Sequence, residues 1–187
     1  MMDTTAVITL LRHGNQLKNT ARTGWVQRGV PQPENVAAHS YGVVFTAMVL
    51  AELVDEEVDN GRLLAIAALH DLPEGLTTDI PTPAWRYLPD GVKTAVERGA
   101  MQEITGGTLF ADRFMPLWEE LHADETIEAR LVHDADKIDM FLQARIYQEQ
   151  TGNRHLDEFW TTPYRFRTPQ AQAIYDVLRA DWEQSIT

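Results

Sequence analysis

Apolar residues recur along most of the chain at intervals of three and four positions, the spacing that places them on one face of an α-helix. Alternating runs of the kind that form β-strands are nearly absent. Prolines and glycines mark the breaks between the periodic segments, as at Pro31, Pro33 and Gly106. The pattern therefore predicts an all-α protein with helices over Thr5–Asn19, Asn35–Val54, Gly61–Asp71, Gly91–Ile104, Arg113–His122, Thr126–Gln150 and Pro169–Gln184.

The 187 residues contain no repeat, low-complexity tract or long linker that would divide the chain. With 44% hydrophobic and 24% charged residues, the composition is that of an ordinary globular protein and argues against disorder. We therefore expect one domain over residues 1–187. The chain has no cysteine, which excludes disulfides and thiolate metal sites and leaves histidine and carboxylates as the strong metal ligands.

The net charge of −12 would repel a nucleic-acid backbone or an anionic membrane surface, so neither is an expected partner. The most apolar stretch, Val36–Val54, contains His39, Ser40 and Glu52, and we interpret it as a buried helix rather than a membrane span. The N-terminus has Asp3 and no basic stretch before an apolar run, so it does not resemble a secretory signal. We expect a cytoplasmic protein.

The charge is unevenly distributed along the chain. Residues 1–30 have a local charge of +3, from four cations and one acid: Arg12, Lys18, Arg22 and Arg28 against Asp3. A solvated helix face explains this as well as a binding site for an anion does. The second explanation requires a chemical group nearby that acts on the anion.

Titratable side chains occur around position 70, where apolar ones are expected. On a helical wheel His70 shares a face with Leu63 and Ile66, so its imidazole is directed to the core. Asp71 follows at the helix end, and burying an unpaired carboxylate costs roughly several kcal/mol. Two explanations are open: a His–Asp hydrogen bond that holds the helix end, or a divalent metal ion bound by both side chains.

The acidic segment 134–139 supplies a third candidate ligand. The core stripe expected for its helix consists of Leu131, Ala135, Ile138, Leu142 and Ile146. Asp136 lies on the ladder beside this stripe and can reach inward from that edge. Asp134 lies on the opposite flank and Asp139 lies nearer to the stripe. The pattern therefore ranks Asp136 first and leaves the other two open.

His39 completes the candidate set, because it shares an apolar ladder with Val43, Thr46 and Leu50, where an unpaired imidazole has no evident structural purpose. Two imidazoles and two carboxylates form a mixed nitrogen and oxygen set that leaves coordination positions for water or substrate. Such a set suits Mn²⁺, Fe²⁺, Co²⁺ or Zn²⁺ better than Mg²⁺. Geometry rather than sequence must choose among these ions.

The order of these residues resembles the metal-dependent phosphohydrolases of the HD-domain superfamily, and more narrowly their 5′-deoxynucleotidase branch. The resemblance covers nearly the whole chain, through RTGWVQRGVPQPENVAAHS (22–40), HDLPEGLTTDIPTP (70–83), WEEL (118–121) and DADKIDMFLQARIY (134–147). It implies a compact bundle of about six to eight helices. It also implies hydrolysis of 2′-deoxynucleoside 5′-monophosphates at one divalent metal ion, whose ligands would be His39, His70, Asp71 and Asp136.

The resemblance also implies two catalytic carboxylates. Glu74 follows His70 by one helical turn and matches a position that exchanges a proton during the reaction. An exposed loop glutamate is the alternative. Asp79 matches an acidic position near the nucleotide sugar and water. Its alternative role is that of a turn residue ahead of Pro81.

Substrate-binding roles follow from the same resemblance. Trp25 precedes His39 by fourteen residues, the interval of the family, and would form an aromatic wall that disfavours a 2′-hydroxyl. A core tryptophan is the alternative. Arg22 and Arg28 are the candidates for binding phosphate, because a guanidinium can bind two oxygens at once.

The chain departs from the family pattern at two positions. Gly24 precedes the tryptophan where part of the family has arginine, so the sequence does not say which arginine binds phosphate. Ala38 precedes the first histidine ligand where relatives often have an acidic residue, and this affects the support of that imidazole. Arg86 and Lys93 could add positive charge after the DIPTP turn.

Other functions stay open at this point. An HD enzyme with the same ligands could release tripolyphosphate from deoxynucleoside triphosphates, and guanosine polyphosphates are a further substrate class. A non-catalytic module, in which a metal only ties helices together, would leave Glu74 and the basic N-terminal patch without a function. We expect a homodimer, from the resemblance and from apolar residues that leave surface for a subunit contact: Met140, Phe141, Tyr147, Phe159 and Trp160.

Overall fold

The computed structural model describes residues 3–81, 84 and 87–185. Within these ranges the chain is helical, apart from loops and one isolated bridge between Ala21 and Asn35, so the all-α class is confirmed. Each predicted helix agrees with an observed one to within three residues at either end. These helices are α1 (Thr4–Gln16), α3 (Val36–Ala51), α4 (Asn60–Leu69), α7 (Val92–Thr105), α8 (Ala111–Ala123), α9 (Ile127–Thr151) and α10 (Pro169–Ser185).

Four short elements were not predicted. They are the α-helices α2 (Thr23–Gln27) and α5 (Glu74–Thr77) and the 3₁₀ helices η1 (Leu17–Asn19) and η2 (Arg154–Trp160). Because each spans at most two turns, none has room for a periodic pattern of apolar positions. The described ranges thus contain nine α-helices, more than the expected six to eight, and the two additional ones are short.

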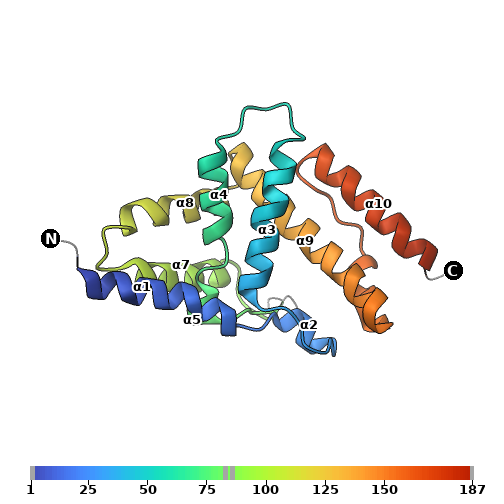
Figure 1. The fold of residues 1–187 in the computed structure, drawn as a ribbon, viewed down its shortest axis with the longest axis horizontal. Helices are drawn as coiled ribbons and strands as arrows, with labels where there is room; N and C mark the ends of the chain where they lie inside the picture. Colours follow the sequence, from blue (N-terminus) through green and yellow to red (C-terminus); the bar gives the residue numbers. More distant parts are fainter. Residues whose placement is uncertain (1–2, 82–83, 85–86, 186–187) are drawn as a thin grey trace.

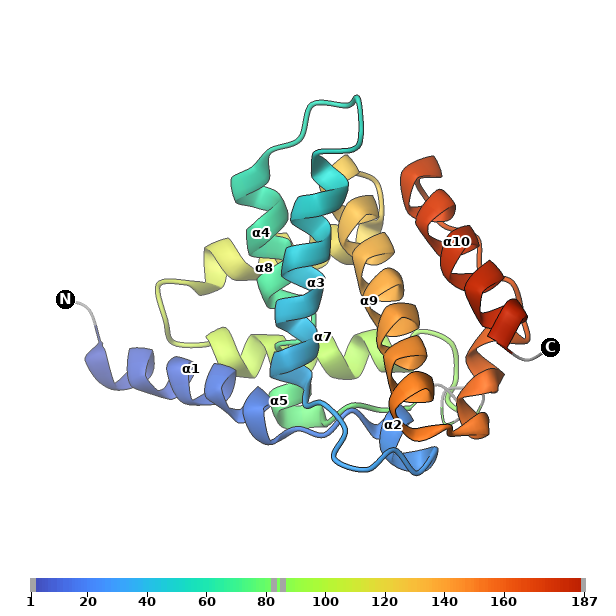
Figure 2. The same cartoon turned by 45° about the vertical axis from the view of Figure 1, so that its right-hand side comes forward.

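Helices α3, α4 and α9 form the centre of the molecule, and α3 runs antiparallel to the other two (Figures 1 and 2). Helix α10 packs on α9, and α8 packs on α4 and α9. Helices α1, α5 and α7 lie together across the lower end of the bundle in Figure 1. This topology brings the start of α3 and the end of α4 to the same end of the bundle.

Two apolar regions stabilise this arrangement. Between α3, α4 and α9 the core is fully buried, as at Val43, Leu63 and Ala135. A second region joins α9, η2 and α10 through stacked and tilted aromatic rings: Phe141, Trp160, Phe166, Tyr175 and Trp182. Burying a large side chain of this kind stabilises the fold by about 1.5–3 kcal/mol.

One predicted core position on α9 is wrong. Leu142 is 41% exposed, whereas its neighbour Phe141 is 3% exposed. The reason is that α9 is covered both by α3 and by α10, so its buried surface is wider than one stripe and turns toward the aromatic region in the second half of the helix. Phe141 and Ala144 therefore take the buried positions.

The predicted surface for a subunit contact is also wrong, because the residues named for it belong to the core. Phe141, Tyr147 and Trp160 are buried, and Met140 and Phe159 pack against buried clusters. Exposed apolar side chains instead line the outer face of α3 and its end: Tyr41, Phe45, Met48, Val49 and Leu53. Among the described helices, none combines the length and apolarity needed to cross a bilayer.

Candidate metal centre

Four side chains from α3, the end of α4 and α9 lie close together. His39 lies at the start of α3, where the side chain of Asn35 caps the helix. His70 and Asp71 follow directly after α4. Asp136 lies near the middle of α9, beside the start of α3. The structure therefore brings together all four residues that were predicted as metal ligands.

The nitrogen and oxygen atoms of these side chains face one another. His39 Nε2 lies 3.6 Å from Asp71 Oδ2 and 3.3 Å from Asp136 Oδ1. His70 Nε2 lies 3.2 Å from Asp71 Oδ2. The candidate ligand atoms of His39, His70 and Asp136 all lie within 4.8 Å of one another. Ligand atoms bound at about 2.0–2.2 Å to one ion lie about 3–4 Å apart, so this spacing suits a single divalent metal.

Both imidazoles are oriented by a bond at their other ring nitrogen. His70 Nδ1 lies 2.8 Å from the carbonyl oxygen of Ala67, and His39 Nδ1 lies 2.8 Å from Asp139 Oδ2. A carbonyl oxygen and a carboxylate only accept hydrogen bonds, so each Nδ1 carries the proton. The lone pair of Nε2 in each neutral ring is then directed at the centre of the cluster, as a metal ligand requires.

Unpaired buried atoms are concentrated at this centre. Over residues 3–81, 84 and 87–185, eight buried side-chain nitrogen or oxygen atoms have no hydrogen-bond partner, and four belong here: His39 Nε2, His70 Nε2, Asp71 Oδ2 and Glu74 Oε2. Leaving such an atom unpaired costs about 1–3 kcal/mol. A divalent cation would satisfy the two imidazoles and the aspartate together, so the residues present fit the metal that the sequence predicts.

The electrostatics of the cluster favour a cation at its centre. Burial, followed by the charge of Arg22, lowers the pKa of His39, but the carboxylates of Asp136 and Asp139 outweigh both and raise the pKa to about 9. Burial raises the pKa of Asp71, but the attraction of the neighbouring His70 outweighs it and holds the pKa below its usual range. The two shifts have opposite origins: carboxylates stabilise a positive charge on His39, and positive neighbours stabilise the negative charge of Asp71. A proton or a metal ion would supply positive charge at this centre.

The structure distinguishes the three aspartates that the sequence left open. Asp136 belongs to the cluster, and Asp139 lies behind it, against His39 Nδ1. Asp134 is fully buried and points elsewhere, because it accepts hydrogen bonds from the backbone N–H groups of Arg167 and Thr168 and from the Thr168 hydroxyl. Asp134 therefore fixes the loop ahead of α10 and lies outside the site.

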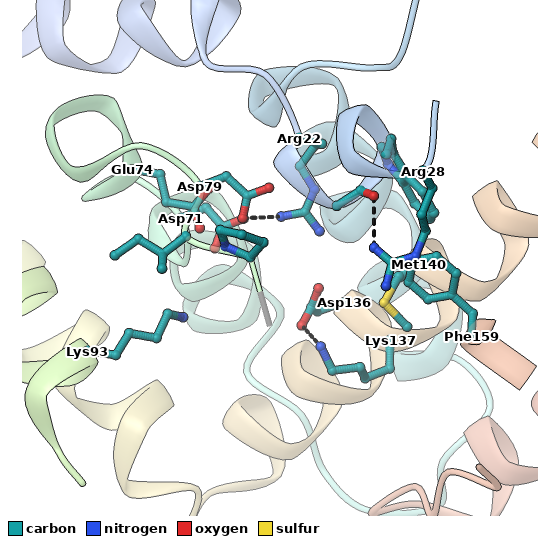
Figure 3. Close-up of a pocket in the computed structure, with 14 residues that line it drawn as sticks. Arg22, Arg28, Asp71, Glu74, Asp79, Lys93, Asp136, Lys137, Met140 and Phe159 are labelled. Atoms are coloured by element: carbon teal, nitrogen blue, oxygen red, sulfur yellow. Dashed lines mark hydrogen bonds and ion pairs between the residues drawn. The ribbon is translucent and has the colours of Figure 1, made fainter. Parts of the chain in front are cut away.

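Glu74 begins α5 and is only 5% exposed, so the exposed-loop alternative is wrong. It lines a cavity of about 130 Å³ together with Asp71, Asp79 and Asp136 (Figure 3). Burial, followed by repulsion from Asp71 and Asp79, raises the pKa of Glu74 to about 10. A carboxyl group in this position is able to hold a proton beside the metal cluster.

Arg22 and Asp79 lie at the same cavity. Arg22 Nη1 is 3.6 Å from Asp71 Oδ2 and 3.8 Å from Asp79 Oδ1. Asp79 Oδ2 accepts a hydrogen bond of 2.7 Å from the N–H of Thr23, and the Thr23 hydroxyl donates to the Asp79 carbonyl at 2.6 Å. Because Thr23 is the first residue of α2, Asp79 caps this short helix from across the cavity. Both residues thus position the segment that carries Trp25.

Trp25 is a buried tryptophan that also lines the cavity beside the metal cluster. It is 2% exposed, packs edge-on against Tyr147 and lies tilted against Phe159. Its indole N–H donates to Glu34 at 3.0 Å. A tryptophan held this firmly forms a rigid wall.

Arg28 also lines the cavity, but its guanidinium is engaged elsewhere. Nη1 donates to the carbonyl of Gly24 at 2.9 Å, and Nη2 donates to Glu158 at 3.0 Å. The guanidinium carbon lies 4.5 Å from the centre of the Phe159 ring, within the range of a cation–π interaction. Of the two arginines, Arg22 is therefore better placed to bind an anion.

Lys137 and Phe159 are among the side chains of the cavity wall that sequence reasoning missed. Lys137 Nζ lies 2.8 Å from Asp136 Oδ2, and its position directly after Asp136 was an available signal. Phe159 lies far along the chain in η2 and offered none. Lys93, which was expected to add positive charge, lines the cavity and pairs with Glu97 at 2.9 Å. Arg86 and positions 82–83 of the DIPTP turn lie outside the described residues.

An all-α bundle with a histidine, a His–Asp pair and a distant aspartate at one end defines a class of helical metal-site proteins. The HD domain family matches residues 14–175, and the chain therefore belongs to this family.

Relatives with assigned activities cover nearly the whole chain. The human 5′-deoxynucleotidase HDDC2 is 33% identical over 186 residues, which is 97% of this chain and 88% of the human protein. The 5′-deoxynucleotidase HDDC2 of Danio rerio is 34% identical over 172 residues, 89% of this chain and 82% of the relative. A conserved hypothetical protein from Pyrococcus furiosus has a solved structure with a TM-score of 0.79 and 36% identity, covering 92% of this chain and 99% of that one.

Proposed function

We propose that the protein is a metal-dependent 5′-deoxynucleotidase, which hydrolyses 2′-deoxynucleoside 5′-monophosphates to deoxynucleoside and phosphate. The observation that carries this proposal is the convergence of His39, His70, Asp71 and Asp136 beside a cavity that Glu74 also lines. The names of the relatives, 5′-deoxynucleotidases, support the substrate class.

The reaction transfers the phosphoryl group to water. A bond forms between the water oxygen and phosphorus, the bond from phosphorus to the 5′-oxygen breaks, and that oxygen leaves with a proton. A divalent cation, when bound, supplies Lewis-acid polarisation of a phosphoryl oxygen. His39, His70, Asp71 and Asp136 would hold it.

The chain itself supplies charge and a proton carrier. Arg22 binds the non-bridging phosphate oxygens, because its guanidinium faces the cavity between two carboxylates. Glu74 exchanges a proton with the attacking water or with the departing 5′-oxygen, a role that its burial beside Asp71 supports. Asp79 holds α2 against the cavity and thereby positions Arg22 and the neighbouring Trp25.

Preference for the 2′-deoxy sugar is assigned to Trp25. Its ring offers a 2′-hydroxyl no hydrogen-bond partner, since its only polar group is already bonded to Glu34. A hydroxyl pressed against this face would lose its water without compensation. The packing of Trp25 against Tyr147 and Phe159 makes it difficult for the wall to move aside.

The charges of the cavity favour a monophosphate over a triphosphate. The wall carries four cations and four acids: Arg22, Arg28, Lys93 and Lys137 against Asp71, Glu74, Asp79 and Asp136. Glu74 holds a proton, and Arg28 and Lys93 pair with Glu158 and Glu97 outside the wall. The remaining formal charges sum to −1, so a divalent cation changes the total to about +1, which is nearer to balance with a phosphate monoester than with a triphosphate. A triphosphate carries more negative charge than this wall can balance.

The finer parts of the proposal are the metal, the compartment and the assembly. The mixed nitrogen and oxygen ligand set suits Mn²⁺, Fe²⁺, Co²⁺ or Zn²⁺.

The protein is proposed to act in the cytoplasm as a homodimer. Helix α3 contains no Asp, Glu, Lys or Arg in its 16 residues and exposes Tyr41 and Phe45. Two copies of this acidic chain that associate through α3 would therefore keep their negative charges away from the interface. Light scattering would measure the assembly.

The proposal is tested by stripping the purified protein with a chelator and screening metals against nucleotides. We expect phosphate release from deoxynucleoside monophosphates with at least one of the four ions, and kcat/KM about 10–100-fold lower for matched ribonucleotides. Tripolyphosphate as the product from deoxynucleoside triphosphates would identify the triphosphohydrolase instead. Metal binding with no turnover of any mono-, tri- or guanosine polyphosphate would identify the non-catalytic module.

A further inference from the structure

A carboxylate that takes no part in the proposed ligand set lies directly behind His39. Asp139 Oδ2 is 2.8 Å from His39 Nδ1, on the side of the ring opposite Asp71 and Asp136. Asp139 lies on α9, one turn after Asp136, so one helix provides both a ligand and the partner of another ligand. His39 itself is 1% exposed, so water has little access to its Nδ1.

We propose that Asp139 is a positioning residue for the metal: its carboxylate holds the proton of His39 on Nδ1 and thereby keeps Nε2 directed at the ion. This inference rests on the metal site of the proposed function. Carboxylates that accept a hydrogen bond from a ligating imidazole fix the orientation of the ring and increase its affinity for metal. The residue directly before His39 is Ala38, which has no acceptor in its side chain, and Asp139 supplies a carboxylate from another helix.

The opposite helix makes room for this contact. A Cβ atom added to Gly42 on α3 would lie 2.0 Å from Asp139 Oδ1 and 2.7 Å from its Cγ. Real side chains do not approach this closely, so any larger residue at position 42 would displace the carboxylate. Glycine in a helix interior is otherwise unfavourable relative to alanine. Gly42 is therefore explained by the space that Asp139 occupies.

A second cation at this position is the alternative explanation, because Glu34, His39 and Asp139 place ligand atoms within 4.8 Å of one another. Two observations argue against it. The separation of 2.8 Å between His39 Nδ1 and Asp139 Oδ2 is that of a direct hydrogen bond, and it is shorter than the spacing of two atoms that share one ion. Glu34 already accepts the indole N–H of Trp25.

The first experiment measures metal affinity in D139N and D139A. Competition with a chromogenic chelator, using Co²⁺ or Mn²⁺ alone, is expected to give dissociation constants about 10–100-fold above wild type. At saturating metal, kcat should recover toward wild type, because Asp139 does not line the substrate cavity. E149Q is the matched control: it removes an acid from an exposed position of the same helix and should stay within about twofold of wild type.

The second experiment uses Gly42, so that the conclusion does not depend on one variant. G42A should weaken metal binding as D139N does, although it leaves every acidic residue in place. In the D139A background the same change should have no further effect on affinity and should raise the Tm, because the clash is gone and alanine favours the helix. Nitrogen NMR should report the proton of the neutral His39 ring on Nδ1 in wild type.

The outcomes separate this inference from the proposed function. If D139N, D139A and G42A all bind metal within about twofold of wild type, Asp139 does not position His39, even if deoxynucleotides are hydrolysed. If the variants lose affinity while the wild type hydrolyses no nucleotide, the positioning role stands and the proposed function falls. A wild-type protein that binds no divalent metal overturns both.

Discussion

Asp134 and Asp136 lie two positions apart on α9, yet their surroundings are opposite. Asp134 accepts three hydrogen bonds from the segment ahead of α10, and each of its oxygens has a partner. Asp136 faces the imidazole of His39 and the ammonium of Lys137, and it lines a cavity that contains other carboxylates. The first carboxylate is fully buried and hydrogen-bonded, whereas the second is half-buried and lines the cavity.

The same contrast extends to the two regions around them. In the aromatic region of α9, η2 and α10, the indole N–H of Trp160 donates to Gln148 and that of Trp182 donates to Asp157. At the metal centre, by contrast, buried nitrogen and oxygen atoms are left without hydrogen-bond partners. A bound ion or substrate would complete this set, so the concentration of unpaired buried atoms at one place is a better guide to function here than burial alone.

The largest expected effect separates the two aspartates. Asp136→Ala removes a ligand and should lower kcat/KM by about 10⁴-fold, which corresponds to about 5 kcal/mol of lost transition-state stabilisation. Asp134→Ala should leave kcat/KM per folded molecule unchanged but lower the free energy of unfolding by about 3–5 kcal/mol, because it strands two backbone N–H groups and a hydroxyl. Steady-state kinetics and urea denaturation measure the two quantities. Equal loss of activity in both variants would contradict the contrast.

Glu74→Gln should lower kcat by about 10³-fold with the metal content unchanged, because it removes the proton carrier and keeps the shape. The metal-free variant should also be more stable than wild type. The pKa of Glu74 is raised to about 10, so its contribution to stability is present below the ordinary glutamate pKa and is lost as the pH rises toward 10.

Differential scanning of chelated protein tests the stability half of this prediction. The Tm of the variant should exceed that of wild type by a few degrees at pH 8, about 2–4 °C for each kcal/mol, and by much less at pH 5. Metal analysis of the same samples is the control for the kinetic half. An unchanged kcat would show that Glu74 does not transfer the proton. An unchanged Tm at pH 8 would show that burial of Glu74 does not destabilise the fold.

The two arginines of the cavity give the smallest expected effect. Arg22→Lys should lower kcat/KM by about 10–100-fold, because lysine cannot bind two phosphate oxygens in the same plane. Arg28→Lys should change kcat/KM by less than about threefold, since its guanidinium is already bonded to Gly24 and Glu158. Its loss should instead reduce stability by about 1 kcal/mol. A larger loss of kcat/KM in Arg28→Lys than in Arg22→Lys would indicate that Arg28 binds the phosphate.

Much of this molecule is predictable from local pattern. The long helices are amphipathic or apolar over many turns, so their extents follow from periodicity. Polar side chains at apolar or buried positions made His39, His70, Asp71 and Asp136 candidates, and the resemblance to the HD-domain family selected these four as a set. The structure brings these four side chains to one centre.

The remainder depends on contacts between distant segments, which a single sequence does not encode locally. Asp134 lies beside a ligand in the chain, but its partners follow 33 and 34 positions later. The guanidinium of Arg28 is engaged by Glu158, 130 positions away. Leu142 was expected in the core because one stripe was assumed, and the packing of α10 on the other side of α9 moved the buried surface to Phe141.

The cap that Asp79 provides for α2 has a consequence for how this site can diverge. One carboxylate secures the backbone of Thr23, and through it the flanking arginine and the tryptophan two positions further on. Arg22, which is proposed to bind the anion, and Trp25, which is proposed to select the sugar, therefore move together. Natural variants at position 79 should therefore lose both kcat and the preference for deoxyribose over ribose. A change in sugar preference at constant kcat requires substitutions at other positions.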